Sequence, residues 1–546
     1  MRCFLVTMLL ALLAAPAMAQ KTEPAKNAPA RKPATEQVPA AKPGESGTEA
    51  AKPAEEKAIE PARPAEADEH YDVAEVAPVV THHQITLEGK ALKYTATAGR
   101  LPIKRVDGKI EAEMFFVAYT LDGQDAARRP LTFAFNGGPG SASVWLHMGA
   151  VGPKKVVMQP NGFMPAAPYR NVDNPYTALD KTDLVMVDAI GTGFSRAETL
   201  QLARKFWGVK GDIQAFGEFI RMYLTRYERW SSPLFLLGES YGTTRAAGVS
   251  GYLADNGISF NGIVLLSTVL NFETLITNKT NDEAYVLTLP TYTMIAAYHK
   301  KLAPELSQDP ARMRQEVEQW AMTEYTQALN KGDALSPAER STAIEHMARY
   351  TGLTKEFIDQ ANLRVDVGKF THNLLLDQKI RVGRLDGRFS GPDPEGLLDT
   401  RFYDPSNSAI LPPYTSVFNS YVRTDLGYKS DMPYNVFAFR TDADREKWDW
   451  GRSIEGFPDT AKALREAMTK NPYLKVLVME GYYDLATPYF AANFTMDHLD
   501  LSPEYRKNIS YATYDAGHMV YLDNESAAKF KKDLAGFIDK SLPPPQ

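Results

Sequence analysis

A serine lies at the centre of Gly238–Gly242, directly after the apolar run Leu234–Leu237. The pentapeptide reads Gly-Glu-Ser-Tyr-Gly, which has the Gly-x-Ser-x-Gly spacing of a nucleophile elbow, where a buried strand turns sharply into a helix. The two glycines permit a turn too tight for a Cβ, and the strained turn pushes the serine hydroxyl out to where a base can reach it. Ser240 is therefore the candidate nucleophile.

A serine nucleophile needs a base, and the base needs an acid to orient it. After an elbow, the acid and the histidine follow the serine in that order. Of the nine histidines, only His498 and His518 lie beyond the point where strand patterns resume after a long helical stretch. His498 has a helix-surface pattern, whereas His518 follows the strand expected at Ile509–Tyr514, in a glycine-containing loop. His518 is the candidate base.

The acid must lie between Ser240 and His518, just beyond a strand. Asp484 meets this condition, because a short loop separates it from the apolar run Val476–Met479. Glu480 lies too close to the strand end, and Asp515 is only three residues from the histidine. We therefore predict Asp484 as the acid, with Asp515 as the alternative.

A glycine loop at Asn136–Gly140, with the sequence Asn-Gly-Gly-Pro-Gly, follows the strand predicted at Leu131–Phe135. Its backbone N–H groups can approach a substrate and stabilise an oxyanion, with the N–H of Tyr241 as a second donor. No Gly-Lys-Ser/Thr follows, so the run does not fit a phosphate loop. We find no metal-ligand motif or dinucleotide fingerprint and predict no cofactor and no metal.

Strands and helices alternate around these residues, which favours a mostly parallel central sheet with helices on both faces. An antiparallel hairpin is expected at the start and a helix at the end. The predicted elements are strands at 93–98, 110–119, 131–135, 184–187, 234–237, 263–266, 474–479 and 509–514, and helices at 211–227 and 525–539.

The alternation is interrupted by a helical, polar-aromatic stretch at Thr274–Gln378. Asp309-Pro310 marks one helix start, and Ser336–Glu339 is a capping box that marks another. The irregular stretch Arg381–Tyr434 is taken to continue the insertion. We therefore predict a helical cap at residues 274–434, lying over the active site.

The N-terminus has the pattern of a signal peptide at residues 1–19: a basic start, the apolar stretch Phe4–Ala15 and a small-residue cleavage site before Gln20. An uncleaved membrane anchor is the alternative. Residues 20–75, rich in Ala, Pro, Lys and Glu, are predicted to be a disordered spacer, and residues 76–546 the catalytic domain. The single cysteine, Cys3, lies inside the signal. The protein is thus expected to be exported, to the periplasm or the exterior, without disulfides.

The net charge of −6 is small for 546 residues, so nothing indicates nucleic acid as a partner. No later segment has the ~20 apolar residues of a membrane helix, so no membrane association is expected after cleavage. The sequence does not indicate an oligomeric state.

Five ordered motifs resemble the serine carboxypeptidase family, peptidase family S10: Phe135–Ser141, Asn174–Tyr176, Asp188–Ser195, Gly238–Gly242 and Ala516–Val520. The resemblance implies an α/β-hydrolase fold with an inserted helical cap. It also implies peptide substrates, from which single C-terminal residues are released.

The resemblance further implies roles within the motifs. Asn136 and Glu239 would bind the terminal carboxylate of the substrate, and Gly138 and Tyr241 would donate their N–H groups to the oxyanion. Two facing carboxylates repel unless one is protonated, so binding should be best at acidic pH and weaken as Glu239 ionises.

The chain departs from the family at Ala134-Phe135, where Trp-Leu is usual, and at Ala150, where a second glutamate is usual. Both positions belong to the family's carboxylate-recognition network, so a weaker acid optimum is expected. An esterase, aminopeptidase or acyltransferase with the same triad is the alternative function, since fold does not fix substrate. A catalytically silent binding protein is a further alternative, although no triad residue is lost.

Overall fold

The computed structural model describes residues 70–393, 403–439, 448–451 and 456–543, which lie within the unit Ala65–Gln546. The predicted signal peptide, residues 1–19, and most of the predicted spacer lie outside the described residues. The segment 70–75 nevertheless contacts the folded unit, because His70 forms a β-bridge with Thr199 and Glu75 pairs with Lys104. The folded chain therefore begins before the expected boundary at residue 76. Within the described ranges, no helix is both long and apolar enough to cross a membrane.

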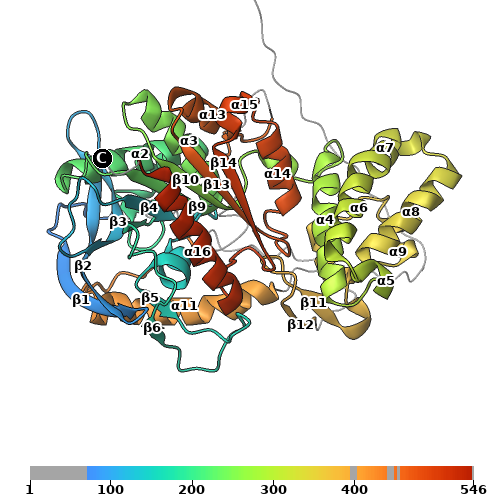
Figure 1. The fold of residues 1–546 in the computed structure, drawn as a ribbon, viewed down its shortest axis with the longest axis horizontal. Coiled ribbons are helices and arrows are strands. Elements are labelled where there is room, and N and C mark those ends of the chain that lie inside the picture. Colours follow the sequence, from blue (N-terminus) through green and yellow to red (C-terminus); the bar gives the residue numbers. More distant parts are fainter. Residues whose placement is uncertain (1–69, 394–402, 440–447, 452–455, 544–546) are drawn as a thin grey trace, which may run out of the picture. The chain divides into compact units, whose positions relative to one another are not determined.

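One large sheet forms the centre of this unit (Figure 1). The neighbours β1–β2, β2–β3 and β3–β7 pair antiparallel, and the short strand β8 (Arg196–Ala197) also pairs antiparallel with β3. The remaining neighbours pair parallel. The prediction of a mostly parallel sheet is confirmed. In sheet order the strands are β1 (Val79–Leu87), β2 (Lys90–Lys104), β3 (Ile110–Leu121), β7 (Asp183–Val187), β4 (Leu131–Phe135), β9 (Leu234–Ser240), β10 (Gly262–Thr268), β13 (Lys475–Gly481) and β14 (Ile509–Tyr514).

Apolar side chains on both faces of the sheet explain its central position. Every residue of β4, β7 and β10 is buried, as expected for parallel strands covered on both sides. Helix α16 (Asn524–Ser541) packs on one face, and α2 (Val209–Arg226), α3 (Tyr241–Asp255) and α13 (Ala461–Lys470) pack on the other. The predicted helices at 211–227 and 525–539 thus lie within two residues of α2 and α16.

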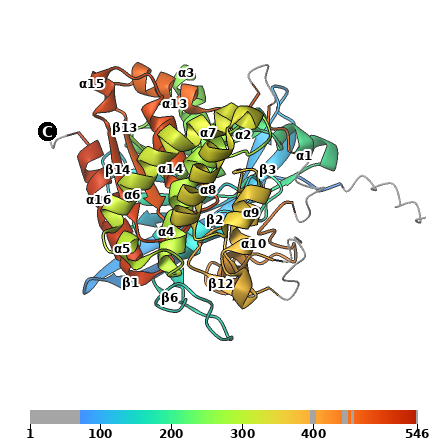
Figure 2. The same ribbon diagram turned by 90° about the vertical axis from the view of Figure 1, so that its right-hand side faces the viewer.

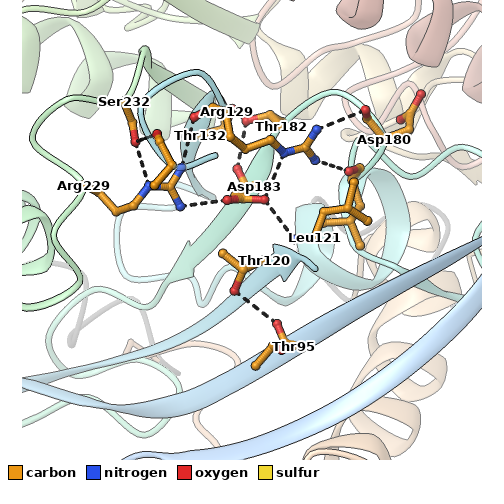
Figure 3. A network of polar contacts seen from close by, with 12 residues as sticks. Thr95, Thr120, Leu121, Arg129, Thr132, Asp180, Thr182, Asp183, Arg229 and Ser232 are labelled. Atoms are coloured by element: carbon orange, nitrogen blue, oxygen red, sulfur yellow. Dashed lines mark hydrogen bonds and ion pairs between the residues drawn. The ribbon is translucent and has the colours of Figure 1, made fainter. Parts of the chain in front are cut away.

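A buried ionic network holds the starts of the strands together (Figure 3). Asp183, the first residue of β7, accepts hydrogen bonds from Arg129 Nε at 3.1 Å and from Arg229 Nη1 at 2.7 Å. The backbone N–H of Leu121, at the end of β3, donates to the same carboxylate at 3.0 Å. Burial of these charges is tolerated because they are paired. The network lies at the N-terminal ends of the parallel strands, whereas Ser240 lies at the C-terminal end of β9.

The inserted helices form a separate apolar core, which includes Leu289, Val317, Met347 and Phe370. They gather at one side of the sheet in Figure 1 and lie in front of it in Figure 2. Both predicted helix starts are present: Asp309 caps one helix, and Ser336 forms a capping box in another. The helices are α4 (Glu283–Tyr298), α5 (Pro304–Ser307), α6 (Pro310–Trp320), α7 (Thr326–Lys331), α8 (Pro337–Thr351), α9 (Lys355–Gln360) and α10 (Val367–Asn373).

The predicted extent of the cap, residues 274–434, is too long. The irregular stretch expected at 381–434 contains the short strands β11 (Ile380–Val382) and β12 (Ser390–Pro392) and the helix α11 (Pro405–Thr424). Helix α11 packs against the sheet rather than in the cap, because Tyr414, Phe418 and Tyr421 occur at helical spacing and join the core of one sheet face. Residues 394–402 lie outside the described residues.

Candidate active site

Ser240 lies at the turn between β9 and α3. Its backbone has φ +62° and ψ −133°, a conformation that costs a side-chain-bearing residue of order 1–3 kcal/mol. A Cβ on Gly238 would lie 2.1 Å from the carbonyl oxygen of Gly242. A Cβ on Gly242 would lie 2.7 Å from the carbonyl oxygen of Phe135. Both glycines of the motif are thus required by close backbone contacts, as the elbow interpretation predicts.

His518 and Asp484 are brought together by the loops after β14 and β13. His518 Nδ1 lies 2.7 Å from Asp484 Oδ2, and the Asp484 side chain is fully buried. The N–H groups of Ala486 and Thr487 donate to Asp484 Oδ1 at 2.7 and 3.0 Å, and the Thr487 hydroxyl donates to Oδ2 at 2.7 Å. A carboxylate held in this way can orient the imidazole with Nδ1–H as donor, which leaves Nε2 available as the candidate base. The alternative acid, Asp515, is exposed.

The backbone of His518 is anchored to the strand beside the candidate nucleophile. Its carbonyl accepts a hydrogen bond from Ser267 Oγ at 2.6 Å, and its N–H donates to Leu385 O at 2.6 Å. Ser267 is next to Thr268, which pairs with Ser240 across β10 and β9. Within the described part of the chain no hydrogen bond joins Ser240 Oγ to His518. Such bonds are often long before substrate binds.

Opposing effects act on the His518 imidazole. Burial alone favours its neutral form, but the charge and hydrogen bond of Asp484 outweigh burial and raise the pKa of His518 above its ordinary value. Glu239 acts in the same direction. An imidazole of raised basicity is suited to accept a proton from a serine hydroxyl.

The glycine loop packs against the start of α3. A Cβ on Gly137 would lie 2.5 Å from the Tyr241 nitrogen, and Gly138 has φ +105°, which favours glycine. The loop thus brings its backbone close to the N–H of Tyr241. Arg245 of α3 fixes the loop, because its Nη1 donates to Asn136 O at 2.6 Å while Nε donates to Asp212 at 2.7 Å.

Glu239, beside the candidate nucleophile, is a buried carboxyl that two polar side chains contact. Its Oε2 accepts a hydrogen bond from Tyr521 Oη at 2.7 Å, and the Asn136 carboxamide lies against it. Burial raises the pKa of Glu239 to about 7, although His518, Tyr521 and Asn136 favour the charged form. Near neutral pH this group therefore exists in both protonation states.

Four contacts at the candidate site were not predicted from the sequence: those of Ser267, Thr487, Arg245 and Tyr521. Ser267 and Arg245 carry no motif signal and are recognised only by the distant backbone atoms that they bind. Thr487 follows the acid by three residues, a spacing at which a hydroxyl can reach a carboxylate. Among the described residues, no group of three or more His, Cys, Asp or Glu is arranged to hold a metal ion.

A solved structure that is similar to this chain supports its fold class. The prohormone-processing carboxypeptidase Kex1 of Saccharomyces cerevisiae is similar in structure, with a TM-score of 0.51 and 17% identity over 82% of this chain and 90% of that chain. A proline iminopeptidase of Mycobacterium smegmatis gives a TM-score of 0.33 and 15% identity over 81% and 98% of the two chains. Comparison with curated proteins gave no match. The fold is that of the α/β-hydrolases.

The family follows from the sequence. Residues 91–518 match the family described as serine carboxypeptidase, and this segment is most of the chain. The chain belongs to the serine carboxypeptidase family and is a serine-type peptidase by that membership.

Proposed function

We propose that this protein is an exported enzyme that hydrolyses peptides at their C-terminal residue through an acyl-enzyme on Ser240. The observation that carries the proposal is Glu239: a buried carboxyl directly before Ser240, against Asn136, with its pKa raised to about 7. A carboxylic acid kept protonated by burial can donate a hydrogen bond to a carboxylate. This is the chemistry that recognition of a free peptide C-terminus requires.

The reaction proceeds in two halves. Ser240 Oγ attacks the carbonyl carbon of the last peptide bond while His518 Nε2 takes the hydroxyl proton. The N–H groups of Gly138 and Tyr241 stabilise the negative oxygen of the tetrahedral intermediate. His518 then gives its proton to the leaving amine, the C–N bond breaks, and the C-terminal amino acid departs. Water, activated by His518, attacks the ester and releases the shortened peptide and the Ser240 hydroxyl.

The test compares one peptide with a free and with an amidated C-terminus, at pH 5.5 and at pH 8, with products identified by mass spectrometry. We expect single C-terminal residues to be removed from the free peptide. The preference for the free over the amidated peptide should be larger at pH 5.5 than at pH 8. Ser240→Ala should give no product. Equal cleavage of the two peptides at both pH values would favour an esterase, aminopeptidase or acyltransferase. Full activity of Ser240→Ala would exclude the proposed nucleophile.

Export and substrate class belong to the same proposal. The signal pattern at residues 1–19 supports delivery to the periplasm or exterior, where peptides are the expected partners. N-terminal sequencing of the protein isolated from its natural compartment should begin at Gln20. Retention of Met1 in a membrane fraction would instead indicate an uncleaved anchor.

A further inference from the structure

Tyr521 joins the loop of the candidate base to the candidate carboxylate-recognition group. It lies three residues after His518, is fully buried, and donates a hydrogen bond to Glu239 Oε2 at 2.7 Å. Burial raises the pKa of Tyr521 well above its ordinary value, so its hydroxyl stays a donor at every pH at which the enzyme works. A phenol in this position occupies one oxygen of Glu239, and the Asn136 carboxamide also interacts with this carboxyl.

A second tyrosine is buried beside Tyr521 but forms no hydrogen bond with Glu239 among the described residues. Tyr414 of α11 is fully buried, and its hydroxyl has no hydrogen-bond partner among the described residues. Both rings close over Gly149, where a Cβ would lie 2.5 Å from Tyr414 Oη and 2.6 Å from Tyr521 Cε2. Two phenols thus share one tightly packed site, but only that of Tyr521 is bonded to Glu239.

We propose that Tyr521 is a specificity-determining residue that holds Glu239 Oε2, presents the other carboxyl oxygen to the C-terminal carboxylate of the substrate, and sets the pH above which that carboxylate is refused. The proposal rests on the proposed carboxypeptidase function. It assigns to a tyrosine on the histidine loop a positioning role in carboxylate recognition that no sequence motif indicated.

The direction of the pH effect follows from the groups that face Glu239. Burial and the charge of Asp484 favour the protonated acid, whereas His518, Asn136 and Tyr521 favour the carboxylate, and Tyr414 has no bond to it. A donor aimed at a carboxylate stabilises its charged form. Tyr521 therefore keeps the ionisation of Glu239 near neutral pH, against the effect of burial. Removal of its hydroxyl should move that ionisation to higher pH.

The experiment measures kcat/KM against pH for the free and the amidated peptide, with Tyr521→Phe, Tyr414→Phe and the wild type. Loss of a hydrogen bond to a charged group corresponds to about one to two pH units in proton affinity. We expect Tyr521→Phe to shift the alkaline fall for the free peptide up by about one unit or more, and to raise KM at pH 5.5 while kcat changes little. Tyr414→Phe is the matched control, which removes a phenol at the same glycine and should leave the profile unchanged.

Two further variants make the result specific to Glu239. In a Glu239→Gln background, Tyr521→Phe should shift nothing, because the titrating group is gone. Site-specific 3-fluorotyrosine at position 521 keeps the ring and strengthens the donor, so it should move the alkaline fall to lower pH. This second variant serves if Tyr521→Phe fails to fold.

The outcomes separate the two proposals. If the wild type favours the free peptide but Tyr521→Phe has an unchanged profile, or shifts no more than Tyr414→Phe, the role of Tyr521 is overturned and the proposed function stands. If the wild type shows no fall that is particular to the free peptide, the proposed function itself fails.

Discussion

Ser240, Asp484 and His518 are expected to act as one unit, because the base is useful only with the nucleophile that it deprotonates. Ser240→Ala and His518→Ala should therefore each reduce kcat by a similar factor, roughly 10⁴- to 10⁶-fold. Active-site titration with a fluorophosphonate probe, followed by steady-state kinetics on the folded variants, measures this. A His518→Ala variant within tenfold of the wild type would exclude His518 as the base.

Glu239 is expected to control binding rather than bond cleavage. Because burial raises its pKa to about 7, kcat/KM for a free C-terminus should fall as the pH rises through that value, while the amidated peptide is unaffected. Glu239→Gln cannot ionise, so its alkaline fall should disappear, and KM at pH 5.5 should rise by about tenfold or less. The pH profile from pH 5 to 9 checks this, and a variant profile that matches the wild type would remove Glu239 from carboxylate recognition.

At the residue scale, the sequence predicts those candidate site residues that belong to a short motif with fixed spacing. The elbow could be identified because Gly238, Ser240 and Gly242 meet their steric requirements within five residues, and chain order then singled out His518. Tyr521 could not be identified, since its bond to Glu239 spans 282 residues and depends on how two loops meet. A tyrosine is also an ordinary core residue, so its type alone indicates no chemistry.

At the element scale, a segment beside the cap holds the histidine loop in place. Asp386 is buried, and its Oδ2 accepts a hydrogen bond from Gly517 N at 3.0 Å. Arg388 pairs with the same carboxylate at 2.7 Å and donates to Asp515 O at 2.6 Å. The loop that carries His518 is therefore fixed from outside the sheet as well as by Ser267.

Asp386→Ala should lower kcat by about ten- to hundredfold with KM within about threefold, because a small displacement of the base affects chemistry more than binding. Stability should fall by about 3 kcal/mol, since Arg388 loses a buried partner. Kinetics and urea unfolding measure the two effects.

Asp386→Asn should recover part of kcat, because its side-chain oxygen can accept the Gly517 N–H. Asp377→Ala is the control, since Asp377 is an exposed partner of Lys301. Equal kcat in Asp386→Ala and Asp377→Ala would contradict the role.

Burial and packing also explain which helices and strands could be identified from the sequence and which could not. Strands β4, β7 and β9 were found because buried parallel strands are short apolar runs. Helix α11 was missed because the stretch 381–434 was taken as irregular, yet the helix continues through Pro412 and Pro413. Its buried tyrosines are needed by the sheet, so tertiary packing decides the structure there rather than local preference.

At the scale of the whole molecule, the unit buries several acids that resist ionisation. Burial raises the pKa of Asp188 to about 6 and that of Glu239 to about 7. Glu480 on β13 is also buried, neither of its carboxyl oxygens has a partner among the described residues, and burial followed by the charge of Asp484 raises its pKa well above the ordinary value. Such acids bind protons in the folded state that the unfolded chain has already lost. Stability is therefore lost as pH rises above their ordinary values.

Glu480→Gln should reduce this loss as the pH rises above the ordinary pKa of a glutamic acid, because glutamine has no proton to lose. While Glu480 stays protonated in the folded protein and ionised in the unfolded chain, it lowers the free energy of unfolding by about 1.4 kcal/mol per pH unit. Urea unfolding at four pH values should give a shallower decline for Glu480→Gln by about that amount. Glu356→Gln, which removes an exposed charge, should decline as the wild type does. Parallel declines for all three proteins would mean that Glu480 is already ionised in the folded state.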